Sequence, residues 1–364
     1  MKRMGVFICY DKDGIVDGAE EHLLKSLAEI LDRFVVVVNG WLSDESIEII
    51  KKYSNEIVMR KNEGFDGGAY QDYLLNHLHK EELLDYDELL LANDTYYGPF
   101  YPWKEVFEPM EKAGYDFWGL TRHLSYFDQH WNTLITEHIQ GYFLVFTRSV
   151  FTNERFFTYW EQLPELHDRN DAILKFEVPL TDYYRSLGYS YGVYTDVFPQ
   201  QDYMKRAENM YIAFCYSLLK DFHLPILKKR DGVNFQNPQT YPAIEYIREH
   251  YANYYHINYL WENAKRTLKS AEPFFWIDDF YYKYDLVYIY GHGKIGRAIE
   301  NYFNVRDWKI AGFIETEPMD EQSIAWKDFH LDENIGIIVA LGRKNTNEVK
   351  QFLPETDAIK YVNL

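Results

Sequence analysis

A glycine-rich stretch, RKNEGFDGGAYQDYL, runs from Arg60 to Leu74 and combines three glycines with charged and amide side chains. Gly64, Gly67 and Gly68 would let a ligand come close to the backbone, because glycine has no side chain to obstruct it. They also start a predicted helix, whose first N–H groups favour negative charge. The stretch therefore favours a small anionic ligand such as a diphosphate. A plain connection between a strand and a helix remains the alternative, since one glycine-rich loop is a weak signal.

A second chemical signal is the sequence Asn93-Asp94-Thr95, which follows an apolar run. A carboxylate at the end of a strand can bind Mg²⁺ or Mn²⁺, because these ions take oxygen ligands from one or two carboxylates and from substrate phosphates. The alternative is that Asp94 only forms a turn before YYGP. Asp94 is therefore a candidate metal ligand, and Mg²⁺ or Mn²⁺ is the candidate cofactor.

Strands and helices alternate along the first hundred residues. Apolar runs predict strands at 5–10, 35–40, 56–60 and 85–94. Helical periodicity predicts helices at 17–34, 44–54 and 67–79, the second one capped by Ser43 or Asp44. This alternation predicts an α/β fold, in which helices cover both faces of a parallel sheet and ligands bind at the carboxyl ends of the strands. The polar residues at these ends are Tyr10, Asp11, Asn39, Arg60 to Gly68, Asn93 and Asp94.

Charge and composition exclude several classes of partner. The chain of 364 residues has 38 lysines and arginines against 57 aspartates and glutamates, a formal net charge of −19. We therefore expect no nucleic-acid partner and no broad adsorption to an anionic membrane. The two cysteines, Cys9 and Cys215, form no metal-binding pattern and fit a reducing compartment. No apolar run has the length of a signal peptide or a membrane span, so we expect a cytoplasmic protein.

The rest of the chain predicts two further domains. Residues 201–282 show helical periodicity with few strand signals, and an α/β pattern restarts near residue 283. We therefore expect an α/β domain at 1–200, a helical extension at 201–282 and a small Rossmann-like domain at 283–364.

The last of these domains carries the sequence GHGKIGRAIE between a predicted strand and a predicted helix. Gly291, Gly293 and Gly296 have the spacing of a dinucleotide fingerprint, and Glu315 is placed to bind a ribose. The domain is too short for a dehydrogenase, and it resembles small Rossmann-like modules that accompany sugar-modifying acyltransferases and glycosyltransferases. We expect it to bind a nucleotide or nucleotide sugar, to serve assembly, or to be vestigial. We do not expect NAD.

Seven segments occur in one order along the chain: FICYDKDGIVDG, RKNEGFDGGAYQDYL, LLLANDTYYGPFYP, DFWGLTRH, HIQGYFLVF, EVPLTDYYRSLGY and LPILKKR. Together they resemble the rhamnan synthesis protein F family of bacterial glycosyltransferases, over roughly residues 5–270. That family is similar to inverting glycosyltransferases with a GT-A fold. The resemblance therefore implies a GT-A-like nucleotide-sugar-binding domain.

The resemblance also implies roles for the polar strand ends. Tyr10, Asp11 and Asn39 would surround the base and ribose of the donor, and Asp94 would bind the metal. The other implied donor contacts are Arg60, Asn62, Gly64, Asp66, Gly67 and Asn93. The sequence departs from the common Asp-x-Asp signature, because Ala92 stands two residues before Asp94. Asp66 could add a second carboxylate, or the metal could be weakly bound or absent.

The resemblance further implies a catalytic base. In FEVPLTDYYRSLGY, Glu177 stands at the second acid of the Glu-Asp-x-x-Leu-x-x-x-Arg pattern of inverting enzymes. Pro179 fits the first turn of a helix, so we expect Glu177 near a helix N-terminus, where the helix dipole favours an ionised carboxylate. Ordinary charge at a helix start is the alternative. Asp182 is a competing carboxylate on a different face of the helix.

Two further groups of residues have weaker signals. His138 and Gln140 lie at the start of a predicted strand, on the expected acceptor side, although a lone histidine is more often structural. Lys228, Lys229 and Arg230 form a basic run that would touch a diphosphate or a membrane surface. A solvated charge run is the interpretation that the sequence favours.

The sequence thus predicts an inverting glycosyltransferase. The resemblance implies dTDP-rhamnose as the donor and a cell-surface polysaccharide or lipid-linked glycan as the acceptor, reached peripherally at the inner membrane face or through a partner. The oligomeric state stays open. The alternative is a nucleotide-binding regulator or oxidoreductase that works through the C-terminal glycine motif.

Overall fold

The computed structural model describes residues 1–197, 209–318 and 323–362. The chain forms two compact units. Unit 1 contains Met1–Met210, Ser217–Lys228 and Tyr246–Leu260, and unit 2 contains Tyr211–Tyr216, Lys229–Glu245 and Trp261–Leu364. The domain boundary that the sequence predicts at residue 200 lies outside the described residues.

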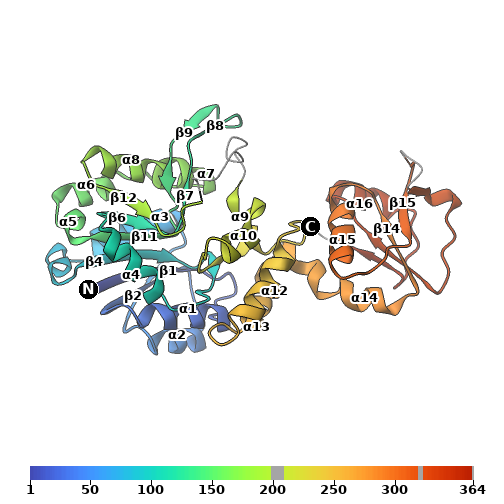
Figure 1. Cartoon of the computed structure of the whole chain (residues 1–364), viewed down its shortest axis with the longest axis horizontal. Coiled ribbons are helices and arrows are strands. Elements are labelled where there is room, and N and C mark those ends of the chain that lie inside the picture. Colours follow the sequence, from blue (N-terminus) through green and yellow to red (C-terminus); the bar gives the residue numbers. More distant parts are fainter. Residues whose placement is uncertain (198–208, 319–322, 363–364) are drawn as a thin grey trace. The chain divides into compact units, whose positions relative to one another are not determined.

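A seven-stranded sheet forms the centre of unit 1 (Figure 1). Its strand order is β12 (Tyr191–Val193), β6 (Phe117–Gly119), β11 (Phe143–Thr147), β4 (Glu88–Asn93), β1 (Arg3–Cys9), β2 (Arg33–Asn39) and β3 (Glu56–Arg60). The strands β1 to β4 are mutually parallel, whereas β11 is antiparallel to both β4 and β6. The predicted α/β class is confirmed, and all four predicted strands of the first hundred residues are present.

Helices cover both faces of this sheet, as Figure 1 shows for α1 and α2 on one side and α5, α6 and α8 on the other. On one face, Tyr70, Trp160 and Tyr184 pack in a single buried cluster with alternate strand residues. On the other face, Trp103 stacks on Phe143. The helical elements of unit 1 up to residue 186 are α1 (Gly18–Ala28), α2 (Asp44–Lys51), α3 (Phe65–Asp72), η1 (Tyr73–His77), η2 (Lys80–Asp85), α4 (Lys104–Ala113), α5 (Arg148–Phe151), α6 (Glu154–Gln162), α7 (Arg169–Asp171), η3 (Ala172–Glu177) and α8 (Val178–Ser186).

Side-chain caps fix where two of these helices begin. The carboxylate of Asp17 accepts from the backbone N–H groups at the start of α1, and the Ser43 hydroxyl accepts from Ser46 N at the start of α2. Each cap satisfies N–H groups that have no partner within the helix. Ser43 is therefore the cap of α2, one of the two residues that the sequence proposes.

Short strand pairs surround the carboxyl edge of the sheet. β5 (Tyr96–Tyr97) pairs with β13 (Leu227–Lys228), β7 (Arg122–His123) with β10 (His138–Ile139), and β8 (Tyr126–Asp128) with β9 (Thr133–Ile135). The first pair brings Lys228, which is remote in sequence, next to the end of β4. The following helices are α9 (Met210–Ala213), α10 (Cys215–Lys220), α11 (Lys229–Gly232), α12 (Thr240–His250) and α13 (Ile257–Thr267).

A five-stranded parallel sheet forms the centre of unit 2. Its order is β16 (Ser323–Ala325), β15 (Gly312–Glu315), β14 (Leu286–Tyr290), β17 (Ile335–Val339) and β18 (Ile359–Tyr361). Its other elements are η6 (Lys269–Phe275), α14 (Ile277–Lys283), α15 (Lys294–Val305), η7 (Trp326–Asp328) and α16 (Arg343–Val349). The predicted strand, glycine turn and helix are thus β14, the loop 291–293 and α15.

Candidate functional site

The carboxyl ends of β1 and β4 meet, because the two strands are neighbours and Ile8 pairs with Asn93. The backbone N–H of Tyr10 donates to Asp94 Oδ2 at 2.9 Å. Asp11 holds its own loop, since its Oδ1 accepts from Asp13 N at 2.9 Å and from Ile15 N at 3.1 Å. The structure therefore brings the polar ends of these two strands together at one edge of the sheet.

The ends of β2 and β3 form a second pair. Asn39 lies opposite Arg60, and Arg60 Nη1 donates to Asn39 Oδ1 at 2.5 Å. The same guanidinium donates to Glu63 O at 2.9 Å and to Asp72 at 3.2 Å. Arg60 thus holds the loop between β3 and α3 in place, while Asn62 in that loop is exposed. Donor contacts by Asn39, Arg60 and Asn62 stay predictions.

Contacts within the chain explain why two positions at the junction of β3 and α3 are glycines. Gly64 has a φ of +74°, a conformation that side chains rarely adopt, and a Cβ there would lie 3.1 Å from Gly68 Cα. A Cβ on Gly67 would lie 2.8 Å from Phe176 Cγ. These contacts support the alternative that the glycines shape a strand-to-helix connection. Gly67 in particular admits Phe176, the residue next to Glu177.

A hydrogen-bonded chain links Asp66 to Lys228 through the end of β4. Asn93 Nδ2 donates to Asp66 Oδ2 at 2.5 Å, and Asn93 Oδ1 accepts from Thr95 N at 3.1 Å and from Thr95 Oγ1 at 2.7 Å. Lys228 Nζ in turn donates to Thr95 Oγ1 at 2.6 Å. Asn93 is buried, and its amide uses both its donor and its acceptor here. It is therefore a structural link between acids and a cation.

The pKa of the Asp66 carboxyl group is shifted by its burial and by the charges around this link. Burial, followed by the negative charge of Asp94, raises the pKa of its carboxyl group to about 7, although Lys228 and the Asn93 hydrogen bond act to lower it. Glu177 also raises this pKa. A carboxyl group responds in this way to charges a few ångströms away. The contacts agree with this: Asn93 and Thr95 link Asp66 to Lys228, and Gly67, next to Asp66, packs on Phe176, next to Glu177.

Glu177 does not lie at a helix N-terminus, so that expectation is wrong. Helical structure begins earlier, at Asp168, whose side chain caps α7, and it continues through η3 into α8. Glu177 is the last residue of η3, a π-helical turn, with helical φ and ψ of −66° and −51°. The wider turn precedes Pro179, whose ring would clash with the turn before it in a regular α-helix. A π-helical turn inside a continuous helix therefore positions this carboxylate, and the dipole at a helix start does not act on it.

His138 faces Glu177 from β10. His138 Nε2 lies 3.8 Å from Glu177 Oε1, and Nδ1 lies 2.7 Å from Thr136 O. Because a carbonyl oxygen only accepts, the hydrogen bond places a hydrogen on Nδ1. Gly141 also packs beside Glu177, since a Cβ on Gly141 would lie 3.7 Å from Glu177 Cγ. The structure thus brings the predicted acceptor-side histidine to the predicted base.

The two other predicted acceptor-side residues differ in placement. Gln140 Oε1 accepts from Thr121 Oγ1 at 2.7 Å, and Thr121 in turn contacts the Tyr142 hydroxyl at 2.8 Å. Gln140 therefore continues the polar network beside the site. Asp182 instead points outward, with 45% of its side chain exposed and Arg185 as its partner at 3.4 Å. Asp182 is not brought together with Glu177.

Two buried residues near Asp94 were not candidates from the sequence. The ligand atoms of Cys9, Glu20 and Asp94 all lie within 4.8 Å of one another, at a spacing that suits a metal ion. Cys9 ends β1 and Glu20 lies in the first turn of α1, and both are buried. An apolar strand residue and a helical acid give no local signal. Only the packing of α1 against the end of β1 reveals them.

Two phenol groups complete the surroundings of Asp94. Tyr70 and Tyr96 are fully buried, and within the described part of the chain neither hydroxyl has a hydrogen-bond partner. Burial raises both pKa values, and the charge of Asp94 contributes to each. Buried polar groups normally have partners. These two unsatisfied hydroxyls therefore add buried polar groups to the surroundings of Asp94.

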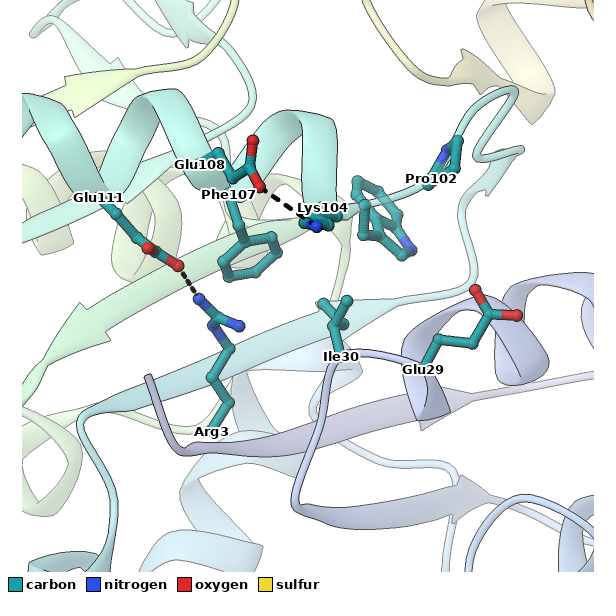
Figure 2. Close-up of a pocket in the computed structure, with 9 residues that line it drawn as sticks. Arg3, Glu29, Ile30, Pro102, Lys104, Phe107, Glu108 and Glu111 are labelled. Atoms are coloured by element: carbon teal, nitrogen blue, oxygen red, sulfur yellow. Dashed lines mark hydrogen bonds and ion pairs between the residues drawn. The ribbon is translucent and has the colours of Figure 1, made fainter.

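A separate cavity of about 450 Å³ lies elsewhere in unit 1 and is lined mainly by α4 and the loop before it. Figure 2 shows Arg3, from the start of β1, directed at Glu111 of α4, with which it forms an ion pair. β1 has seven residues and is therefore roughly 20 Å long. The cavity thus lies at the amino edge of the sheet, opposite Asp94, and it contains none of the predicted site residues.

The glycine motif of unit 2 has a tight and an open part. Gly291 has a φ of +103°, and a Cβ on Gly296 would lie 2.0 Å from Gly291 O, so the strand and helix approach closely there. Nothing lies within 4 Å of a Cβ on Gly293. Glu315 ends the neighbouring strand β15, and His292 stacks on Phe313 with ring centroids 3.9 Å apart. The predicted residues are together, but nucleotide binding stays a prediction.

The fold and site define an α/β protein whose polar groups gather at the carboxyl ends of parallel strands, where such proteins bind ligands. The model of the family "Rhamnan synthesis protein F" matches residues 34–304, which is more than half of the chain. The chain therefore belongs to the rhamnan synthesis protein F family.

Individual relatives are distant. The uncharacterized protein y4gN of Sinorhizobium fredii is 24% identical over 210 residues, which cover 57% of this chain, and the match spans about half of that relative's length. Glycosyltransferase GlyE of Streptococcus pneumoniae has a TM-score of 0.33 at 11% identity, over 96% of this chain and 83% of its own. A putative nucleotide-diphospho-sugar transferase of Desulfovibrio desulfuricans has a TM-score of 0.31 at 11% identity, over 51% and 78%. These scores are too low to assign an activity.

In residues 1–197, 209–318 and 323–362, no helix combines the length and the apolar character that a membrane crossing requires.

A matched pair of glycine substitutions tests how Glu177 is positioned. Gly67→Ala should lower the free energy of unfolding by about 1–3 kcal/mol, because the new Cβ collides with Phe176. Gly68→Ala is the control, since its Cβ would meet only Glu63 O at 3.4 Å. Urea unfolding of both variants checks this expectation. Equal stability of the two variants would contradict the packing of Phe176 on Gly67.

The raised pKa of Asp66 predicts a pH dependence of stability. The unfolded chain ionises Asp66 near pH 4, whereas the folded chain keeps its proton up to about pH 7. The folded state therefore loses stability as the pH rises through this window. Asp66→Asn should remove this loss, so its stability relative to wild type should grow by about 4 kcal/mol between pH 4 and pH 8, at about 1.4 kcal/mol for each of roughly three pKa units. A difference that stays constant with pH would contradict the prediction.

Proposed function

We propose that the chain is an inverting glycosyltransferase that transfers a sugar from a nucleotide-sugar donor to a glycan or lipid-linked acceptor. One observation carries the proposal: Asp66 joins the two acids, because Asn93, next to Asp94, donates to Asp66, and Gly67, next to Asp66, packs on Phe176, next to Glu177. The candidate metal ligand and the candidate base thus lie on two sides of one small site. Membership of the rhamnan synthesis family supports a sugar transferase with a GT-A-like domain. It also favours dTDP-rhamnose as the donor.

Glu177 would act as the general base. Its carboxylate would take the proton of the acceptor hydroxyl while that oxygen attacks the anomeric carbon, and the bond from this carbon to the diphosphate would break. The electron pair of that bond would leave with the diphosphate. His138 would support Glu177, because its Nδ1 hydrogen is held by Thr136 O and its Nε2 faces the carboxylate. Nε2 can then accept the proton that Glu177 has taken.

The residues around Asp94 fit a divalent cation. Cys9, Glu20 and Asp94 offer one sulfur and two carboxylates at a suitable spacing. Mg²⁺ prefers oxygen ligands throughout, so this set fits Mn²⁺ or Zn²⁺ better, whereas Asp94 with diphosphate oxygens alone fits Mg²⁺ or Mn²⁺. When bound, the ion would offset charge on the departing diphosphate. The chain's own contribution is to hold Asp94 in place through Tyr10 N.

Unit 2 supports a second, separate role in nucleotide binding. The open position at Gly293, beside the close contact of Gly296 with Gly291, is what a phosphate needs in order to approach the backbone. We propose that this role accompanies the transferase and does not replace it. An oxidoreductase has no support among the described residues beyond the glycine motif itself.

Turnover of donors tests the proposed chemistry. The full chain with Mn²⁺ should release nucleoside diphosphate from at least one of a panel of nucleotide sugars, with dTDP-rhamnose expected first. Glu177→Gln should lower kcat by roughly 10²–10⁴-fold, because it removes the base. Asp182→Asn is the matched control from the same helix and should retain activity, since Asp182 points outward. If no donor is consumed, or if Glu177→Gln turns over normally, the mechanism is wrong.

Cobalt spectroscopy tests the metal ligands. Bound Co²⁺ should give a thiolate-to-cobalt charge-transfer band in the wild-type chain, because Cys9 would be a ligand. Cys9→Ser should abolish the band. Cys215→Ser, which replaces the other buried cysteine, should leave it intact. A band that survives Cys9→Ser, or no band in the wild type, would show that Cys9 does not bind the metal.

A further inference from the structure

Lys228 is turned into the candidate site and is not part of a solvated charge run. It lies on β13, which pairs with β5 so that Lys228 is opposite Tyr96. Its Nζ donates to Thr95 Oγ1 at 2.6 Å and lies 4.1 Å from the centroid of the Tyr142 ring. A hydroxyl and an aromatic face thus fix the ammonium group beside the end of β4. The interpretation favoured by the sequence is therefore wrong for this residue.

The site needs a cation of this kind. Asp66, Asp94 and Glu177 make it strongly acidic, and the whole chain has a formal net charge of −19. A diphosphate would add two or more negative charges to the same place. The guanidinium of Arg60 is already held by Asn39 and Asp72 at the end of β3. Lys228 is a cation whose charge acts on Asp66, and Asn93 and Thr95 link the two groups.

We infer that the Lys228 ammonium group binds the diphosphate of the donor, with Thr95 and Tyr142 as the residues that position it. This inference rests on the proposed transferase function and names the residue that receives its leaving group. As the bond between the anomeric carbon and the diphosphate oxygen breaks, the electron pair moves to that oxygen. Lys228 stabilises the charge that develops there. The cation is therefore most important when the bond is nearly broken.

The alternative is that Lys228 only neutralises the acids and never touches the donor. The two roles differ in one measurable way. A direct contact lowers the dissociation constant of a nucleoside diphosphate and leaves that of the matching nucleoside unchanged. A purely structural role affects both ligands alike, because it acts through the folded site.

The experiment compares nucleosides with their diphosphates on the full chain. Dissociation constants of dTDP, UDP, GDP and CDP are measured by calorimetry, and those of the weaker nucleosides by ligand-observed NMR. Lys228→Met should weaken the best diphosphate roughly 10- to 100-fold, as expected for one hydrogen bond to a charged group, and should leave its nucleoside unchanged. Lys228→Arg should retain part of the affinity. Arg230→Met, an exposed residue of the same basic run, is the control and should behave as wild type.

Each outcome decides between the roles. Equal loss for nucleoside and diphosphate, or no loss for either, overturns the inference while the proposed function stands. A wild-type chain that binds no nucleoside diphosphate and consumes no donor overturns both. If Lys228→Met fails to fold, Thr95→Val keeps the charge but removes the hydroxyl that holds it. This variant should raise KM for the donor and leave nucleoside binding unchanged, and equal KM values would overturn the inference.

Discussion

The carboxyl edge of the first sheet concentrates negative charge, and the Asn93 amide is the link by which the fold accommodates it. Asn93 Nδ2 donates to Asp66, and Oδ1 accepts from the Thr95 hydroxyl. That hydroxyl in turn accepts a hydrogen bond from the Lys228 ammonium group. An acid, an amide, a hydroxyl and a cation from three distant segments thus form one chain of bonds. In surroundings of low dielectric, such a network is strong only while every member is satisfied. The positions of Asp94 and Lys228 depend on it.

The opposite side of the site depends on close packing. Phe176 fits against Gly67 and Gly141, two positions where a Cβ would lie 3.0 Å or less from its ring. The π-helical turn that ends at Glu177 presents the carboxylate toward His138 while Phe176 stays buried. Gly67, which the sequence suggests as a place for a ligand, therefore helps to position Glu177 through the neighbouring ring of Phe176. The same stretch also holds Asp66, so it joins the two sides of the site.

Local patterns predicted much of the fold and part of the site. Alternating apolar runs and helical periodicity are properties of neighbouring residues, so the four parallel strands and the polar ends at Asn39 and Asp94 could be read directly. The π-helical turn could not be read, because Pro179 suggests a helix start when its neighbours are unknown. Cys9 and Glu20 carry no local signal either, and the basic run around Lys228 favoured a solvated surface. They become site residues only through contacts between segments that lie far apart in the sequence.

A crystal structure of the full chain with a nucleoside diphosphate and Mn²⁺ tests the central claim most directly, because it locates the diphosphate. The account predicts the diphosphate at the carboxyl ends of β1 and β4, between Asp94 and Lys228, with Glu177 facing the place of the transferred sugar. A nucleotide that binds only at the Gly291–Gly296 loop, or only in the cavity beside Arg3 and Glu111, would contradict the account.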